Sequence, residues 1–428
     1  MEKLLDFLKK GVSPFHAVAQ VQSRLQQAGY EKLPAQGTWQ LTPGGRYYVS
    51  PYRSMLIAFC VPGQWDETTG VKIALAHTDF PCFKIKPNPS VERKGYGQLN
   101  VEPYGGMIKE TWFDRPLGIA GKVVMQGADA YHPKVELFES VGAVAVIPSL
   151  APHLNRETDS KKMDLQQEML PLLTMTGAED HFSWEEYLAQ VFRVEPEAIL
   201  DYDLFLTNLD EPEMVGLRGE YISAPRIDNL ASVAAITDAL EQVQETEHFL
   251  VAGLFDHEEI GSRSKQGADS TLLIRVLEKM TANLGIDSVT MQDMLARGFL
   301  LSVDGAHGLH PNYPGKSDIT NDLILGKGFA IKSSASQRYL SDSEAVAVLE
   351  SLCRAHDISR QRQVNRSGMP GGQTLGPLAV SRLSMPGADV GIPMLAMHSA
   401  RELAHFSDYR ALTELIHVYF NEKERKSD

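Results

Sequence analysis

The pattern of apolar and polar positions predicts strands and helices along much of the chain. Residues 13–29 have their apolar side chains on one helical face, and Ser13, Pro14 and Gly29 are the residue types that cap, open and close a helix. Later segments are apolar runs bounded by turn residues, or have the spacing of helices. The segments predicted as strands are 55–62, 71–80, 248–259 and 299–307, and those predicted as helices are 230–243, 271–285 and 343–357.

The pattern of predicted strands and helices divides the chain into two kinds of region. From about residue 214 onward, strands and helices alternate, which is typical of a largely parallel α/β sheet with helices on both faces. Between about 83 and 213, short β-like pieces such as GKVVM and AVAVIP alternate with turns, and the polar stretch 155–168 indicates a loop or an exposed segment. The pattern therefore predicts one discontinuous α/β domain, 1–82 and 214–428, and an inserted β-rich domain, 83–213.

The amino-acid composition limits the binding partners and the cellular compartment that we expect for the protein. The chain has 428 residues, with 41 Lys and Arg against 55 Asp and Glu, so its formal net charge is −14 and nucleic acid is not an expected partner. No apolar run reaches the ~20 residues that span a bilayer, and the N-terminus lacks the pattern of a signal peptide. The three cysteines form no CxxC pair. We therefore expect a cytoplasmic protein that does not contact membranes.

Histidines and carboxylates follow the apolar strands at several separate places. In open α/β sheets, ligands bind outside the carboxyl ends of the strands, so these side chains are expected to meet at one edge. His and carboxylate groups suit divalent metals, zinc above all, with cobalt or manganese as substitutes. The candidates are His77, Asp79, Asp228, Glu258, Glu259, Asp304 and His398.

The number of candidates favours a pair of metal ions. A single catalytic zinc needs about three protein ligands, whereas this set is larger and includes a carboxylate that could bridge two ions. His77 and Asp79 are two residues apart, so both side chains face the same way on a strand and Asp79 could orient His77. Of the adjacent Glu258 and Glu259, one could bind a metal while the other acts as a general base.

Each motif taken alone also has an ordinary structural interpretation. A His–Asp pair is often half-buried and structural, two adjacent glutamates commonly end a strand in solvent, and Asp228 could cap the helix that follows it. The glycine-rich segment GMPGGQTLGP predicts a tight turn and lacks the lysine of a phosphate loop. The metal-site hypothesis rests on the coincidence of several such groups at strand ends.

Six segments in order along the chain resemble one known family. They are AHTDFPCFKIK, APRIDNLAS, FDHEEIGSRSKQGA, SVDGAHGLHPNY, IKSSASQRY and GIPMLAMHSARE. They are similar to the successive motifs of the aspartyl aminopeptidase and vacuolar aminopeptidase I family, family eighteen of the metallopeptidases. The resemblance implies a three-layer catalytic domain with a mostly parallel central sheet, and a di-zinc exopeptidase that removes N-terminal residues from peptides.

The same resemblance assigns roles to the candidates. It implies that His77 and Asp304 bind one metal, that Glu259 and His398 bind the other, and that Asp228 bridges the two. Two further roles are implied, with Glu258 as the general base and Asp79 as the residue that orients His77. The family is expected to use the β-rich insert for dimerisation and to assemble its dimers into large homo-oligomers, often dodecamers.

The resemblance does not decide which N-terminal residue of a substrate is preferred. His153 resembles a histidine that reaches a neighbouring subunit's active site, and Lys332 matches a family lysine near the substrate pocket. Lys332 is the best positive partner for an acidic Asp or Glu at the substrate N-terminus, and its alternative is a solvated surface lysine. Gly368 stands where the family commonly carries an acidic residue, and Phe80 where many members have a small one.

Two other functions fit the same features. A related di-metal amide hydrolase, such as a deacylase, would use the same metal pair without requiring a free substrate amine. A non-catalytic assembly protein of the same fold would be expected to lack one or more of the ligands, whereas all the candidates and the glutamate base are present.

Overall fold

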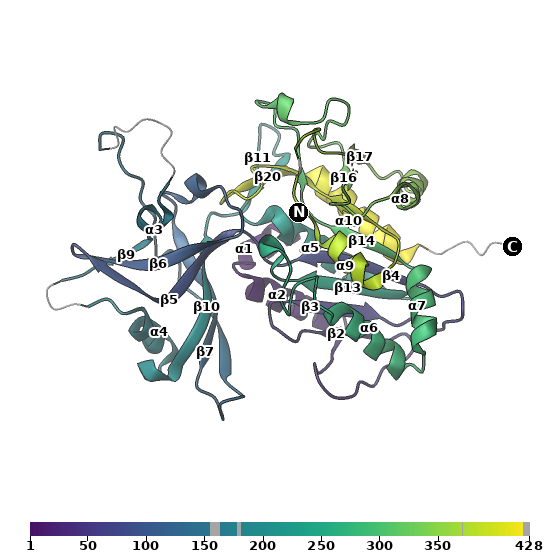
Figure 1. The fold of residues 1–428 in the computed structure, drawn as a ribbon, viewed down its shortest axis with the longest axis horizontal. Helices are drawn as coiled ribbons and strands as arrows, with labels where there is room; N and C mark the ends of the chain where they lie inside the picture. The colour runs from purple at the N-terminus through teal and green to yellow at the C-terminus, as the bar shows by residue number, and fades with distance from the viewer. Residues whose placement is uncertain (155–162, 178–180, 370, 423–428) are drawn as a thin grey trace. The chain divides into compact units, whose positions relative to one another are not determined.

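The computed structural model describes residues 1–154, 163–177, 181–369 and 371–422. Its contacts divide the chain into two compact units (Figure 1). The first unit contains residues 1–79, 212–397 and 402–428, and the second contains residues 80–211 together with 398–401. The short segment 398–401 joins the second unit although it is distant in sequence, which the hydrophobic pattern did not predict.

The first unit is built around a mixed nine-stranded sheet. Its central strands run parallel to one another, and the sheet becomes antiparallel where β3 meets its neighbours and where β16 meets β18. In sheet order the strands are β1 (Glu31–Lys32), β2 (Arg46–Val49), β3 (Leu56–Cys60), β13 (Phe249–Phe255), β4 (Val71–His77), β14 (Phe299–Val303), β18 (Gly387–Gly391), β16 (Phe329–Lys332) and β17 (Arg360–Gln363).

Helices cover both faces of this sheet. Every residue of β4 and of β13 is buried, as expected when a strand has helices on either side. On one face, Ile73 and Leu75 share an apolar cluster with α6, α7 and α9, and α5 and α10 contact β4 as well. The helices of the first unit are α1 (Glu2–Lys10), α2 (Pro14–Gln27), α5 (Ile227–Gln242), α6 (Leu272–Asn283), α7 (Ser288–Ala296), α8 (Ser343–Ala355), α9 (Leu375–Leu383) and α10 (Phe406–Asn421).

A small five-stranded sheet completes the first unit. Two of its strands adjoin predicted or functional residues, because β20 begins at Glu402 and β15 begins two residues after Asp304. In order, its strands are β11 (Glu213–Val215), β12 (Tyr221–Ala224), β20 (Glu402–His405), β19 (Pro393–Leu395) and β15 (Ala306–His307).

The second unit is an antiparallel sheet with short helices. The strands, in sheet order, are β8 (Lys134–Glu139), β7 (Leu117–Met125), β10 (Ile199–Asn208), β5 (Cys82–Arg93), β6 (Tyr96–Tyr104) and β9 (Leu172–Met175). The helices are α3 (Leu165–Glu168) and α4 (Trp184–Phe192). Trp184 and Leu188 are the buried large residues of α4, and Trp184 meets the Phe138 ring of β8 edge-on, with the ring centroids 6.3 Å apart.

Most predicted elements are confirmed, with differences at their ends. Ser13 caps α2 by accepting a hydrogen bond from the His16 backbone N–H, and Gly29 has a positive φ just after the helix. The segment AVAVIP forms only isolated bridges, so it is not a strand. Within the polar stretch 155–168, residues 155–162 lie outside the described part, and the exposed helix α3 ends the stretch.

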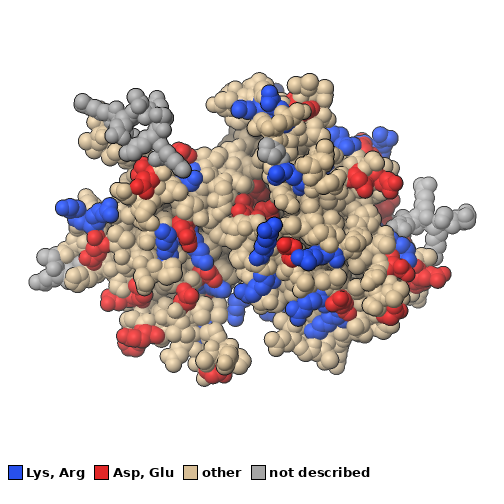
Figure 2. Space-filling view, in the orientation of Figure 1, with Lys and Arg blue, Asp and Glu red and all other residues tan. Residues whose placement is uncertain are grey.

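The surface carries charges of both signs (Figure 2), and the cysteine side chains lie inside the protein. On the face drawn in Figure 2, basic and acidic side chains are interspersed. The three cysteines, Cys60, Cys82 and Cys353, are free and buried. Among the described residues, no helix combines the length and the apolar character that crossing a bilayer requires.

Candidate metal centre

Three neighbouring parallel strands end where the predicted site residues begin. β4 lies between β13 and β14, and all three run in the same direction. His77 is the last residue of β4, Asp304 follows β14 directly, and a 3-10 turn at Glu258–Ile260 follows β13. Because the carboxyl ends of parallel strands meet at one edge, these side chains come together although they are far apart in sequence.

His77 is at the centre of the cluster. Its Nε2 lies 3.4 Å from an Asp304 carboxylate oxygen and 3.6 Å from an Asp228 carboxylate oxygen. One ligand atom each of His77, Asp228 and Glu259 lies within 4.8 Å of the others. His77 and Asp228 are buried, so these groups face one another rather than bulk water.

Asp79 connects the histidine to the glutamate turn. Its carboxylate lies 3.3 Å from His77 Nδ1, and its backbone carbonyl oxygen lies 3.0 Å from the same nitrogen. The two carboxylate oxygens accept hydrogen bonds of 3.1 Å from the backbone N–H groups of Glu258 and Glu259. Asp79 is fully buried, and it thereby fixes both the imidazole and the turn that carries the two glutamates.

The two glutamates belong to the turn rather than to a strand end. The sequence predicted a strand through residue 259, whereas β13 ends at Phe255 and the backbone at His257 turns with a positive φ. Adjacent side chains on a strand point to opposite faces, but this reason for giving the two glutamates different roles does not apply to a turn. They have different environments for another reason, because Glu259 has a carboxylate oxygen within the metal-ligand cluster while Glu258 adjoins it.

Burial, together with the crowding of acids, shifts the pKa values of the glutamates strongly. Burial raises the pKa of Glu258 to about 8, and the carboxylates of Asp304, Asp79 and Asp228 act in the same direction while His77 opposes them. Burial and the Asp228 charge raise the pKa of Glu259 well above its ordinary value. Burial would also raise the pKa of Asp304, but the positive charges of Lys332 and His77 outweigh it and hold that pKa low.

This donor set fits divalent cations. Several buried carboxylates within a few ångströms of one another repel, and a bound cation relieves that repulsion while keeping them ionised. Imidazole and carboxylate are the ligand types that zinc accepts, and a His oriented by a carboxylate is a common arrangement at zinc sites. His77, Asp228, Glu259 and Asp304 are the residues of the first unit that could hold such ions.

Asp228 is held by a residue that the sequence analysis did not single out. Its backbone N–H donates a 2.9 Å hydrogen bond to the carboxylate of Glu402, which is itself buried at the start of β20. The next residue, Asn229, donates from its side chain to the Val303 carbonyl oxygen, 2.8 Å away. Glu402 ends the quoted segment GIPMLAMHSARE, so the motif contained it, but no spacing rule connected it with Asp228.

Lys332 is not a solvated surface lysine, so that alternative is wrong. Only 2% of the residue is exposed. Its Nζ donates a hydrogen bond to the Gly305 carbonyl oxygen, next to Asp304, and lies 5.4 Å from the centroid of the Tyr339 ring. The ammonium group is therefore a fixed positive charge behind the Asp304 carboxylate.

His398 and His153 belong to the second unit. His398 has a positive φ, and its Nδ1 lies 2.8 Å from the Gly106 carbonyl oxygen, which fixes the ring orientation. His153 lies in an exposed turn. The roles predicted for both stay predictions, as does the effect of Gly368, which has a φ of +83° and open space around its Cα.

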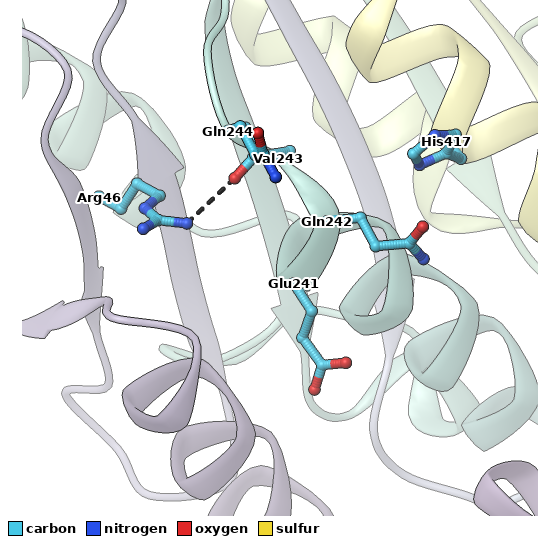
Figure 3. Close-up of a pocket in the computed structure, with 6 residues that line it drawn as sticks. All are labelled: Arg46, Glu241, Gln242, Val243, Gln244 and His417. Atoms are coloured by element: carbon cyan, nitrogen blue, oxygen red, sulfur yellow. Dashed lines mark hydrogen bonds between the residues drawn. The ribbon is translucent and has the colours of Figure 1, made fainter.

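A separate polar hollow lies at the other end of α5 (Figure 3). Its volume is about 650 Å³, and it is lined by Arg46, Glu241, Gln242, Val243, Gln244 and His417. Arg46 donates to the Val243 carbonyl oxygen, 3.0 Å away, and Glu241 binds Arg24 and Lys3. The backbone of Asp228 and Asn229 is not helical, and Glu241 lies 11 positions beyond Leu230, which is roughly 17 Å at 1.5 Å per residue, so the hollow is not part of the metal cluster.

Comparisons with known proteins agree with one another. A profile of the family "Aminopeptidase I zinc metalloprotease (M18)" matches residues 7–420. A probable M18 family aminopeptidase 2 from Clostridium acetobutylicum is 39% identical over 426 residues, covering 98% of both chains.

Solved structures are similar over nearly the same length. A chain in the cryo-EM structure of the Ape4 and Nbr1 complex has a TM-score of 0.92 and 31% identity, covering 97% of this chain and 84% of that one. The S. cerevesiae mApe1 dodecamer has a TM-score of 0.83 and 25% identity, covering 98% and 95%. The chain therefore belongs to the M18 family of aminopeptidase I zinc metalloproteases, and it is an aminopeptidase of the zinc metallopeptidase class.

Proposed function

We propose that this M18 aminopeptidase uses two zinc ions per subunit, held at the carboxyl edge of its central sheet. The observation that carries the proposal is the cluster of buried His77 and Asp228 with half-buried Glu259, and Asp304 beside His77. In this proposal His77 and Asp304 bind one ion, Glu259 and His398 bind the other, and Asp228 bridges them. Cobalt or manganese can substitute, because the same donors accept them.

Glu258 and Asp79 carry out the remaining catalytic work. When bound, a zinc pair supplies a Lewis acid for the scissile carbonyl and makes hydroxide available near neutral pH. Glu258 accepts the proton from the attacking water and delivers it to the leaving amine. Asp79 keeps the His77 ring oriented and, through its two backbone hydrogen bonds, keeps the Glu258 turn in place.

The substrate is a peptide with a free N-terminus. We propose a preference for N-terminal Asp or Glu, with Lys332 as the positive partner for the acidic side chain. Its burial and its contact with the Gly305 carbonyl oxygen support a fixed positive charge near Asp304. His153, from a neighbouring subunit, is the proposed donor to the developing oxyanion.

We also propose that the protein works as a cytoplasmic homo-oligomer. The β-rich second unit is the proposed dimerisation domain, and dimers assemble into a dodecamer. The similarity to the S. cerevesiae mApe1 dodecamer over 98% of this chain supports this assembly.

Metal removal with matched substrates tests the function. Enzyme treated with a chelator is assayed on peptides with N-terminal Asp, Glu, Leu, Met and Lys, each with a free or an acetylated N-terminus, and zinc is then restored. We expect activity to disappear with zinc and return with it, acetylated peptides to resist cleavage, and the acidic N-termini to be cleaved fastest. Full activity without metal contradicts the proposal, and cleavage of acetylated peptides favours a deacylase.

A further inference from the structure

A second pocket of the first unit begins close to the metal cluster. Its volume is about 270 Å³, slightly below the range of pockets for drug-sized ligands, which suits one or two residues of an extended peptide. It is lined by His307, Gly308, His310, Lys316, Ser317, Asp318, Asn321, Leu323, Gln363, Val364, Asn365, Arg366, Met369 and Gly371.

The pocket shares two chain segments with the cluster. His307 follows Asp304 by three residues, which can separate their Cα atoms by at most about 11 Å. Gln363, which also lines the pocket, pairs in register with Lys332, whose Nζ contacts the Gly305 carbonyl oxygen. An extended peptide advances about 3.3–3.6 Å per residue, so two or three residues bridge the distance from the cluster to the pocket.

The charges that line the pocket favour an anion. Lys316 and Arg366 line it, and neither forms an ion pair with a carboxylate in the described part of the chain. Asp318 also lines it, but its Oδ1 accepts hydrogen bonds of 3.1 Å from the backbone N–H groups of Thr320 and Asn321. Two cations without ionic partners are notable in a chain with a net charge of −14, because the protein as a whole repels anions.

Two further groups define the hydrogen bonds available. His310 Nδ1 accepts from the Asn312 backbone N–H, 3.2 Å away, so a neutral ring carries its proton on Nε2 and can donate from it. Gln363 is 4% exposed, and its side-chain oxygen has no hydrogen-bond partner among the residues that the structure describes. A buried amide oxygen without a partner is costly, and a ligand N–H can satisfy it.

We propose that this pocket binds the C-terminal carboxylate of a short peptide substrate, with Lys316 and Arg366 as its ionic partners and Gln363 as the acceptor for a peptide N–H. The inference rests on the proposed aminopeptidase function, and it adds a second recognition point to the free N-terminus. Peptides of three or four residues fit it best, because they reach the pocket from the cluster.

Binding measurements test the pocket separately from catalysis. The zinc-loaded E258Q enzyme, which leaves substrate intact, is titrated by calorimetry with Leu-Ala-Ala and Asp-Ala-Ala, and with their four-residue versions, each as the free acid and as the C-terminal amide. We expect the free acid to bind about tenfold more tightly than the amide. In the K316Q and R366Q variants of this enzyme, the ratio of the free-acid affinity to the amide affinity is expected to fall towards one. The affinity for the amide should stay unchanged, and it therefore shows that each variant is folded.

Matched controls identify the carboxylate and the cations. Lys327 is exposed and does not line the pocket, so K327Q should keep the parent ratio. Amidated peptides with Glu or Gln at the third position report an acidic side chain instead. The proposal is overturned by a ratio of one at every length, by an unchanged ratio in K316Q and R366Q, or by discrimination that follows the Glu side chain. Failure of the wild-type zinc enzyme to release the N-terminal residue from either the free acids or the amides defeats the proposed function, while the binding ratio remains measurable.

Discussion

The two ends of α5 carry acidic residues in opposite circumstances. Near its C-terminal end, Asp238 and Glu241 bind Arg24, and Lys3 adds a second positive charge to Glu241. At its N-terminal end, Asp228 faces Glu259 and His77 within the cluster.

The comparison teaches how buried acids can be interpreted. Where arginine and lysine neutralise them, the acids hold helices together. Burial alone would raise the pKa of Glu241, but the hydrogen bonds and charges of Arg24 and Lys3 outweigh it and lower that pKa. Where acids outnumber the nearby cations, burial raises their pKa values, as for Glu258 and Glu259. A surplus of buried acid indicates a site that an external cation completes.

The largest expected effect comes from Glu258, the proposed general base. Glu258→Gln keeps the size of the side chain but removes the group that moves the proton, so kcat should fall about 10²–10⁴-fold with zinc retained. Glu241→Gln, at the other end of α5, should keep kcat within about twofold. Steady-state kinetics on an aminoacyl-nitroanilide, with zinc content measured on the same samples, distinguish the two ends. An equal loss of kcat in both variants would contradict the proposed difference between the two groups of acids.

Removal of the proposed bridge should cost the metal itself. Asp228→Asn withdraws a charged ligand from the cluster, so bound zinc should fall below the wild-type content and the thermal midpoint should drop, because bound metal stabilises the folded state. Metal analysis after dialysis and thermal unfolding with and without added zinc measure both effects. An Asp228→Asn protein with full zinc content and full activity would show that Asp228 does not bridge.

Glu402 should influence zinc through Asp228. Glu402→Ala removes the acceptor for the Asp228 backbone N–H, and zinc affinity should fall about 10–100-fold. Glu402→Gln keeps an acceptor oxygen and should recover part of that loss. Competition with a zinc-binding dye measures the affinity directly. Unchanged affinity in Glu402→Ala would assign Glu402 a packing role only.

The ion pairs at the other end of α5 should affect stability without affecting zinc. Arg24→Ala breaks hydrogen bonds to two largely buried acids and should lower the free energy of unfolding by about 1–3 kcal/mol. The exposed Lys10–Asp6 pair is the matched control, and Lys10→Ala should cost less than about 0.5 kcal/mol. Chemical denaturation gives both values, and a zinc loss in Arg24→Ala would contradict the separation of the two ends.

The smallest effect is a pH dependence at Glu241. Its pKa is lowered in the folded protein by Arg24 and Lys3, which overcome burial, so its stabilising contribution is present above the unfolded value of 4.5. That contribution is lost as the pH falls through the lowered folded pKa. The stability difference between wild type and Glu241→Gln should therefore be largest above pH 4.5 and shrink in more acidic solution. A difference that grows on acidification would contradict the assigned sign.

The sequence predicted the fold class and the edge at which the site residues gather. Strands such as β4 are buried throughout, consist mostly of apolar residues and end next to polar groups, so both the strand and its end could be predicted from the sequence. The register of β13, β4 and β14 could not be predicted, because it depends on pairing between residues 178 apart for β13 with β4 and 227 apart for β14 with β4. The link from Glu402 to Asp228 was hidden for the same reason, since a backbone N–H leaves no mark in a sequence pattern.

Diffraction at the zinc absorption edge tests the central claim most directly. Crystals of the zinc-loaded protein should show two anomalous peaks, both bounded by Asp228, with His77 and Asp304 at one and Glu259 at the other. The account is contradicted if these side chains surround no peak, or if the zinc ions lie elsewhere while the enzyme remains active.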